Sequence, residues 1–450
     1  MYRKRVALIS LLFWNILSMV EAKTIYLPKR YIDGKIVLTQ DMIKDKNTTF
    51  IIKHQYDLLG AIINLPEGSV LKFGNRGQLT NGTLVGHNSS LITKSSAAIF
   101  NDISITGIWN VAEISSNLFL FSSNDSELNT RNFRSMCMLT SDGNKGVIHI
   151  VNGVYSIKLD EAGKSCFNLN SDTELIVDGD IVLEGNGLEF YQIVQIKNKE
   201  NVKVHGAGSL IGDIESHFGT TGEWGMGIAI LDSDNIEIRD LTIMNCWGDC
   251  IYIGQVGYNK ESYSQGVVIE DVVCKAGRRQ GMSIISGKDI YVTNSKFIDT
   301  GSIKFTAPGA GIDIEPNILG NTIVDNIVID HCEFYGNAND RDFLTYNLDS
   351  TANVVLRNSK LKGHFYFGKG SYNIVIDSCE LNSVLTPQDN YGNIRIKNSL
   401  ITTKTKVDKS VIVENCEFVG KKLSTLEILM FPCALVLTIG VFGIGKYNKS

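Results

Sequence analysis

The sequence predicts an all-β protein built as a right-handed, single-stranded parallel β-helix that follows a β-rich N-terminal region. One phrase recurs eight times between residues 236 and 418: two or three aliphatic residues, then Asp or Asn, then a small or sulfur-containing residue. Successive copies are separated by 31, 23, 36, 28, 19, 21 and 17 residues. A repeat near twenty residues is too short for a strand and a helix, and its Val and Ile content favours strands. The copies end at Asp240, Asp271, Asn294, Asp330, Asn358, Asp377, Asn398 and Asn415.

The rest of the chain is organised around this repeat. Residues 23–141 form the β-rich N-terminal region, in which short Val- and Ile-containing segments alternate with Asn and Gly turn residues. Within it, residues 116–141 are polar, and we expect them to be helical or irregular. Strand-like segments continue without a linker over residues 142–420, so this range is the predicted β-helix.

Both ends of the chain carry apolar segments. Residues 1–22 combine a basic start, an apolar stretch and small residues before a cleavage position, which is the pattern of a signal peptide. Residues 428–445 contain no charge and precede two lysines, which predicts a C-terminal transmembrane segment. A hydrophobic capping helix and a frame-shifted end are the alternatives. We therefore expect an exported protein (extracellular, periplasmic or at the cell surface) with a membrane anchor.

Charge and cysteine content narrow the range of functions. The formal net charge of −5 becomes −7 when residues 1–22, with three basic residues and one acidic residue, are removed. An acidic body argues against nucleic acid as a partner. Cys332, Cys379 and Cys416 share one position of the repeat with Ser359 and Ser399. Such a position suits a stack of small interior residues, so we predict free thiols there and no disulfides.

Three successive rungs, at residues 249–254, 280–285 and 310–315, gather polar side chains on one outer face. In each of them aliphatic residues occupy alternate positions. Because side chains alternate across a strand, the aliphatic residues should face inward and the others outward. The expected outer columns are Tyr252, Ser283 and Asp313; Asp249 and Gln280; and Gly254, Ile285 and Glu315.

Asp249, Arg279, Asp313 and Glu315 are the candidate catalytic residues on this face. Rungs lie about 4.8 Å apart, so Asp249 and Asp313 should be roughly 10 Å apart, near the upper end of the range for inverting hydrolysis of a glycosidic bond. The alternative is that the Asp residues form turns and the arginine faces solvent. His217, in a preceding loop, is a further candidate acid or base.

Aromatic and polar residues near this face are candidates for substrate contact. Sugar rings stack on aromatic side chains, although tryptophans at rung corners can instead cap the core. One candidate, Tyr258, falls in the polar insertion over residues 255–265. The substrate-binding candidates are Trp224, Trp247, Tyr252, Tyr258, Arg278 and Gln280.

Residues 146–155, 175–179 and 202–212 resemble the opening coils of polygalacturonases, the family-28 glycoside hydrolases of the pectate-lyase-like β-helix superfamily. Residues 222–254 resemble the core of that family, and also β-helix proteins of gut bacteria and phage tailspikes. The resemblance covers roughly residues 142–420. It implies a right-handed β-helix and a polysaccharide as the partner.

The polygalacturonase catalytic motif is mostly absent. Gly225-Met226-Gly227 stands where the family has its first aspartate, Gly248-Asp249 where it has an aspartate pair, and Gln280-Gly281 where it has His-Gly. Ordinary polygalacturonase activity is therefore not expected. Two other chemistries of the superfamily stay open. Pectate lyases use an arginine as base and carboxylates that hold calcium, roles that Arg279 and the three candidate carboxylates would fill. Alginate epimerase-like β-helices have a histidine directly after such an arginine, and this chain has Gln280 at that position.

Two functions thus remain open from the sequence. The first is a polysaccharide lyase or glycosidase that acts on an acidic, uronate-containing polysaccharide in a groove around residues 249–315, with calcium as a candidate cofactor and no identified metal ligands. The second is a noncatalytic β-helix, meaning a glycan-binding module, an adhesin or a degenerate enzyme.

Overall fold

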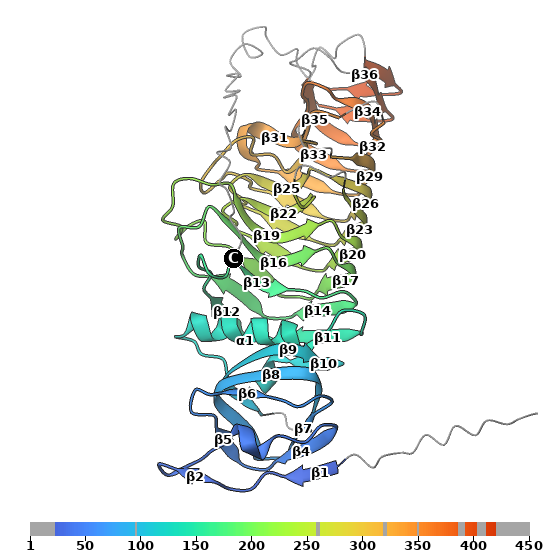
Figure 1. Ribbon diagram of the computed structural model, residues 1–450. Helices are drawn as coiled ribbons and strands as arrows, with labels where there is room; N and C mark the ends of the chain where they lie inside the picture. Colours follow the sequence, from blue (N-terminus) through green and yellow to red (C-terminus); the bar gives the residue numbers. More distant parts are fainter. Residues whose placement is uncertain are drawn as a thin grey trace, which may run out of the picture.

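The computed structural model describes residues 23–94, 97–257, 262–317, 322–348, 351–385, 392–402 and 411–419. In this part of the chain, parallel strands are stacked along one long axis (Figure 1). The predicted signal peptide, the predicted transmembrane segment and Tyr258 lie outside the described residues. Among the residues that are described, no helix is long and apolar enough to cross a membrane.

The N-terminal end is a seven-stranded sheet whose strands all pair in parallel. Phe50, Tyr56 and Trp109 are fully buried beneath it. A short antiparallel hairpin, β2 (Tyr31–Ile32) and β3 (Lys35–Ile36), and the 3-10 turn η1 (Gln40–Met42) connect the first strands. The sheet consists of β1 (Lys23–Tyr26), β4 (Thr48–Ile52), β5 (Gln55–Asp57), β6 (Ile62–Asn64), β7 (Val70–Phe73), β8 (Gln78–Ile92) and β9 (Phe100–Trp109).

One α-helix, α1 (Ser126–Leu139), lies between this sheet and the following rungs (Figure 1). It follows the 3-10 turn η2 (Ser116–Leu118) and falls in the segment expected to be helical or irregular. Asp125 caps the helix by accepting a hydrogen bond from the Leu128 N–H at 2.8 Å. Phe133 and Met136 are fully buried, so the helix contributes its apolar face to the core.

A twelve-stranded parallel sheet forms one face of the coil. Its last eight strands are the eight predicted repeats, in chain order. In six of the eight phrases the Asp or Asn has a positive φ angle, as at Asp240, Asn294 and Asn358 with 52°, 51° and 50°, a backbone conformation that Asn and Asp tolerate well. In the other two phrases the residue after Asp330 or Asp377, namely His331 or Ser378, has the positive φ angle. The strands are β10 (Glu113–Ser115), β11 (Gly146–Ile150), β14 (Thr173–Val177), β17 (Glu200–His205), β20 (Asp234–Arg239), β23 (Ser264–Glu270), β26 (Gly287–Thr293), β29 (Val324–Asp330), β32 (Val354–Arg357), β34 (Tyr372–Asp377), β36 (Gly392–Lys397) and β38 (Val411–Glu414).

The other faces belong to an eighteen-stranded sheet that contains two parallel ladders. The first ladder consists of β12 (Val154–Ile157), β15 (Asp180–Leu183), β18 (Ser209–Ile211), β21 (Thr242–Met244), β24 (Val273–Lys275), β27 (Lys296–Ile298) and β30 (Glu333–Tyr335). The second, which carries the candidate site, consists of β13 (Ser165–Asn168), β16 (Phe190–Lys197), β19 (Trp224–Leu231), β22 (Asp249–Gly254), β25 (Gln280–Ile284), β28 (Ile312–Ile314) and β31 (Arg341–Thr345). After the 3-10 turn η3 (Ala338–Asp340), the ladders meet in β33 (Lys360–Phe367), β35 (Glu380–Leu385), β37 (Leu400–Ile401) and β39 (Glu417–Phe418).

The interior is a continuous stack of aliphatic, aromatic and small residues. The eight cysteines of the described ranges are all free, and all but Cys416 are buried. In the predicted Cys/Ser position, the Ser359 hydroxyl accepts a hydrogen bond from the Cys332 N–H at 3.0 Å, and Ser399 does the same for Cys379 at 3.1 Å. The small-residue stack is thus confirmed, and so is the predicted all-β, right-handed parallel β-helix fold.

Candidate functional site

The site lies on the outer face of β22, β25 and β28, which are neighbours in the second ladder. Tyr252 pairs with Ser283 and Ser283 with Asp313, while Asp249 pairs with Gln280, as the sequence predicted. The alternating aliphatic residues are fully buried inside the coil: Ile251, Ile253, Met282, Ile284, Ile312 and Ile314. The fold therefore places one carboxylate on β22 and another two strands further on.

Asp249 and Arg279 form a bidentate ion pair. Arg279 Nε donates to Asp249 Oδ1 at 2.8 Å, and Nη2 donates to Oδ2 at 2.7 Å and to Ser283 Oγ at 3.2 Å. Burial lowers the pKa of Arg279, but the Asp249 charge and hydrogen bonds outweigh burial and hold that pKa above its usual value. Arg279 is therefore held as a cation by the fully buried Asp249 carboxylate, and the catalytic roles predicted for these two residues stay predictions.

Asp313 and Glu315 form a second carboxyl group cluster at the end of β28. Burial, followed by the nearby Glu315 charge, raises the pKa of Asp313 well above its usual value. Burial also raises the pKa of Glu315, while Arg279 and a hydrogen bond with Asp313 oppose the rise. Gln280 Nε2 donates to Asp313 Oδ2 at 2.7 Å; within the described chain, the buried Asp313 Oδ1 has no hydrogen-bond partner. The structure therefore places two carboxyl groups with raised pKa values within electrostatic reach of Arg279.

Sequence reasoning missed one carboxylate at this site, Glu223. Its Oε2 lies 3.7 Å from Arg279 Nη1, and its side chain is 43% exposed. Glu223 directly precedes β19, two rungs before Arg279, and it does not belong to the alternating pattern that identified the other candidates. Only the long reach of the arginine across the rungs reveals it.

Trp247 and Arg278, two of the predicted contact residues, are buried and pack against each other. Trp247 is 3% exposed. The His217 ring stacks on it at 3.7 Å between centroids, and the Arg278 guanidinium lies 3.7 Å from the same centroid. Arg278 is itself buried and donates to the carbonyls of Trp247, at 2.7 Å, and Gly222. These residues form a buried stack that joins the loop after Gly212 to the rung that carries Arg279.

His217 and Gln280 are likewise internal. His217 Nδ1 bonds to Asp213 Oδ2 at 2.8 Å with both side chains fully buried, and Tyr191 donates to the other Asp213 oxygen at 2.6 Å. Gln280 is fully buried, and its Oε1 accepts a hydrogen bond from the Ala310 N–H at 2.7 Å while its amide holds Asp313. Both residues position other groups, and both side chains lie below the surface.

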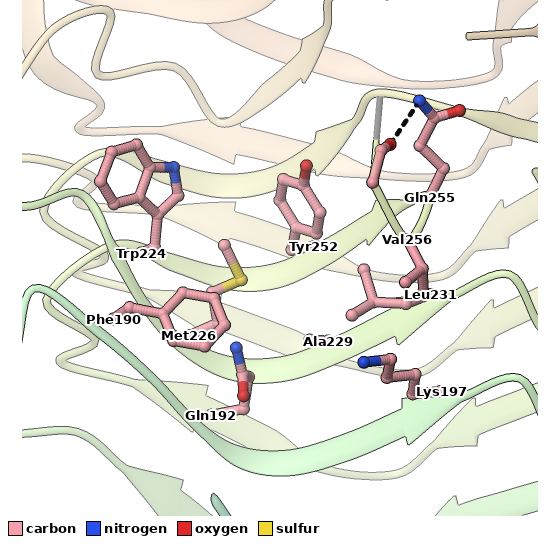
Figure 2. Close-up of a pocket in the computed structure, with 11 residues that line it drawn as sticks. Phe190, Gln192, Lys197, Trp224, Met226, Ala229, Leu231, Tyr252, Gln255 and Val256 are labelled. Atoms are coloured by element: carbon pink, nitrogen blue, oxygen red, sulfur yellow. Dashed lines mark hydrogen bonds between the residues drawn. The ribbon is translucent and has the colours of Figure 1, made fainter. Parts of the chain in front are cut away.

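A pocket of about 320 Å³ opens beside this cluster, on β16, β19 and β22 (Figure 2). Trp224 and Tyr252, two of the predicted contact residues, line it together with Phe190. A Cβ at Gly254 would lie 2.6 Å from the Tyr252 ring, so glycine is required there for this ring position. Tyr252 belongs to the pocket and to the Ser283–Asp313 column, and it therefore connects the two.

Calcium does not fit the arrangement of the carboxylates. Among the described residues, no group of three or more His, Cys, Asp and Glu side chains is placed to hold a metal ion. Asp249 is bonded to Arg279, and Asp313 accepts a hydrogen bond from Gln280. Ca²⁺ requires six to eight oxygen ligands, so these carboxylates do not make up such a site.

Comparison with known proteins gives the following likenesses. No protein family pattern matches the chain. The SPbeta prophage-derived protein YorA of Bacillus subtilis is 28% identical over 217 residues, which are 43% of this chain and 36% of the relative. The chain thus spans about a third of that relative's length.

Two solved structures are also similar. An exopolygalacturonase from Thermotoga maritima is 14% identical, with a TM-score of 0.45 over 70% of this chain and 89% of its own. The A-module of a mannuronan C-5 epimerase from Azotobacter vinelandii is 14% identical, with a TM-score of 0.41 over 62% of this chain and 90% of its own. The β-helix assignment rests on the strand pairing of this chain itself.

Proposed function

We propose that this chain cleaves a polysaccharide by acid–base chemistry on the outer face of β22, β25 and β28. The observation that carries the proposal is the Asp313–Glu315 carboxyl pair, whose members both have raised pKa values and lie near the fixed Arg279 cation. Carboxyl groups kept protonated by their surroundings are suited to act as general acids near neutral pH.

In this proposal Glu315 donates its proton to the glycosidic oxygen as the bond from the anomeric carbon to that oxygen breaks. Gln280 fixes the orientation of Asp313, and burial raises the pKa of Glu315 so that it can hold the proton. Water adds to the anomeric carbon and gives up a proton to a carboxylate. Glu223, half-exposed on the other side of Arg279, is the accessible carboxylate for that step.

Hydrolysis is favoured over a lyase reaction in which Arg279 is the base. An arginine base has to lose its proton, whereas the bidentate contact with Asp249 raises the pKa of Arg279. A lyase or epimerase would therefore need another residue as base.

A noncatalytic glycan-binding module is the second candidate. It is favoured by the burial of the carboxylates, because Asp249 is 0% and Asp313 2% exposed, while the open pocket lies on neighbouring strands. In that case the cluster supports the fold and only the pocket meets the ligand.

One experiment separates these functions. Purified wild-type protein and the Glu315→Gln variant are incubated with a panel of acidic and neutral polysaccharides, and reducing ends and unsaturated uronate absorbance are followed. New reducing ends without unsaturated products in wild type, lost in Glu315→Gln without loss of glycan binding, support hydrolysis. Binding without any product supports the binding module, and unsaturated products support a lyase.

A further inference from the structure

The pocket beside the carboxyl cluster has aromatic walls and no acidic lining residue. Phe190, Trp224 and Tyr252 come from three successive strands, β16, β19 and β22. No Asp or Glu is among the described residues that line it. No carboxylate of the described lining residues would therefore repel an anionic ligand here.

One pocket residue, Gln192, presents a hydrogen-bond donor that the protein does not use. Gln192 is 1% exposed, and its Oε1 accepts a hydrogen bond from Gln195 Nε2 at 2.9 Å. That bond fixes the orientation of the amide, so Nε2 is the group left over. It has no partner in the described part of the chain, and Figure 2 shows it directed into the pocket. A buried amide N–H without an acceptor is unfavourable because it has lost its hydrogen bonds to water, and a ligand acceptor would restore one.

A cation lies further along the same strand, β16. Lys197 ends β16, is exposed, and lines the pocket near Leu231. In the ranges that the structure describes, no carboxylate pairs with its ammonium group. Lysines of the opposite sheet differ in this respect: Lys203, for example, lies 3.4 Å from Glu237.

We propose that this pocket is a subsite for a sugar that carries a carboxylate or a sulfate. The ring would stack between Trp224 and Tyr252, and the anionic group would meet Lys197 Nζ and Gln192 Nε2. The proposal rests on the proposed function in one respect, since the polymer held here is the one presented to Glu315 through the shared residue Tyr252. The binding itself does not depend on cleavage.

The test measures binding by calorimetry in the Glu315→Gln background, so that no probe is consumed. The probes are polygalacturonate, its fully methyl-esterified form, and dextran sulfate. The variants are Lys197→Met and Lys197→Glu, both at an exposed position, and Gln192→Leu. Lys203→Met, which removes a lysine from the opposite sheet, is the matched control.

We expect Lys197→Met and Gln192→Leu to weaken binding of a charged probe about tenfold, with a larger loss for Lys197→Glu and no change for Lys203→Met. The esterified polymer should bind weakly and equally to all variants. Preference for polygalacturonate over dextran sulfate identifies a carboxylate site, and the reverse preference a sulfate site. Equal binding by all variants, equal binding of the esterified polymer, or no binding of either charged probe overturns the subsite.

These outcomes are separable from those for cleavage. If wild-type protein cleaves a polysaccharide and Lys197→Glu does not change the rate, the proposed function is supported and the subsite is contradicted. If charged probes bind in a way that depends on Lys197 but wild-type protein yields no product, the subsite is supported and the hydrolytic function is contradicted.

Discussion

Arg279 donates two parallel hydrogen bonds, of 2.8 and 2.7 Å, to the carboxylate of Asp249, which is completely removed from solvent. The pair joins β22 to the residue that precedes β25. Arg279 also contacts Ser283, on β25, and Glu223, directly before β19. Asp249 is therefore the counter-ion that orients the Arg279 cation and is not itself a free acid or base.

Breaking this pair should destabilise the fold strongly. Asp249→Asn leaves the Arg279 charge buried without its partner, and we expect the free energy of unfolding to fall by about 3–5 kcal/mol. Urea denaturation measures the change. Glu333→Gln, which breaks the exposed Lys296–Glu333 pair at 3.5 Å, is the control and should cost less than about 1 kcal/mol. Equal effects of the two substitutions would show that the Asp249 pair has no special role.

The pH dependence of any cleavage should depend on Glu315. Burial raises its pKa above the usual 4.5, so the acid form persists to higher pH and its loss produces the alkaline limb of the rate profile. Glu315→Gln should abolish activity, whereas Glu315→Asp should keep a reduced rate with a displaced alkaline limb. An unchanged pH profile in Glu315→Asp would assign the acid to another residue.

The same pKa shift makes a prediction about stability. A carboxyl group with a raised folded-state pKa contributes stability that is complete below its unfolded-state pKa and is lost as the pH rises through the folded-state value. For Asp313 and Glu315 the loss begins above their usual values of 3.8 and 4.5. The unfolding free energy of the double variant Asp313→Asn/Glu315→Gln should therefore fall less than that of wild type as the pH rises from about 4 to 8. Parallel curves for the two proteins would contradict the shifts.

The outer columns of the site could be predicted because strand alternation and a recurring repeat length determine the register. Tyr252, Ser283 and Asp313 are aligned for that reason. Side-chain reach could not be predicted in the same way. Glu223 joins the site only because Arg279 extends toward it. Gln192 lines the pocket from β16, which lies before the three rungs on which the sequence pattern placed the site. Likewise, nothing in the pattern around Trp247 reveals that His217, thirty residues earlier, covers its ring.

Glu223 should act as the base if cleavage is hydrolytic. Removing this carboxylate in Glu223→Gln should lower the whole pH–rate profile by about 10²–10⁴-fold. Added azide or formate should restore part of the rate in Glu223→Ala by taking over the role of the missing carboxylate. Glu189→Gln, a change at a carboxylate bonded to Thr221 in the adjoining loop, is the control. A wild-type profile in Glu223→Gln would confine this residue to an electrostatic role beside Arg279.

The two tryptophans near the site should respond to substitution in opposite ways. Trp247 is buried between His217 and Arg278 and its Nε1 donates to the Thr221 carbonyl at 3.2 Å, so Trp247→Ala should lower the unfolding free energy by about 3–5 kcal/mol. Trp224 is partly exposed in the pocket wall, so Trp224→Ala should leave stability within about 1 kcal/mol of wild type and weaken glycan binding. Trp247→Phe keeps most of the stack and should restore stability without altering binding. Denaturation and calorimetry on the same preparations measure both effects. If the Trp247→Ala protein were stable but bound glycan weakly, the ring of Trp247 would have to be accessible to the ligand. The binding surface would then lie at the loop after Gly212 and not at the pocket.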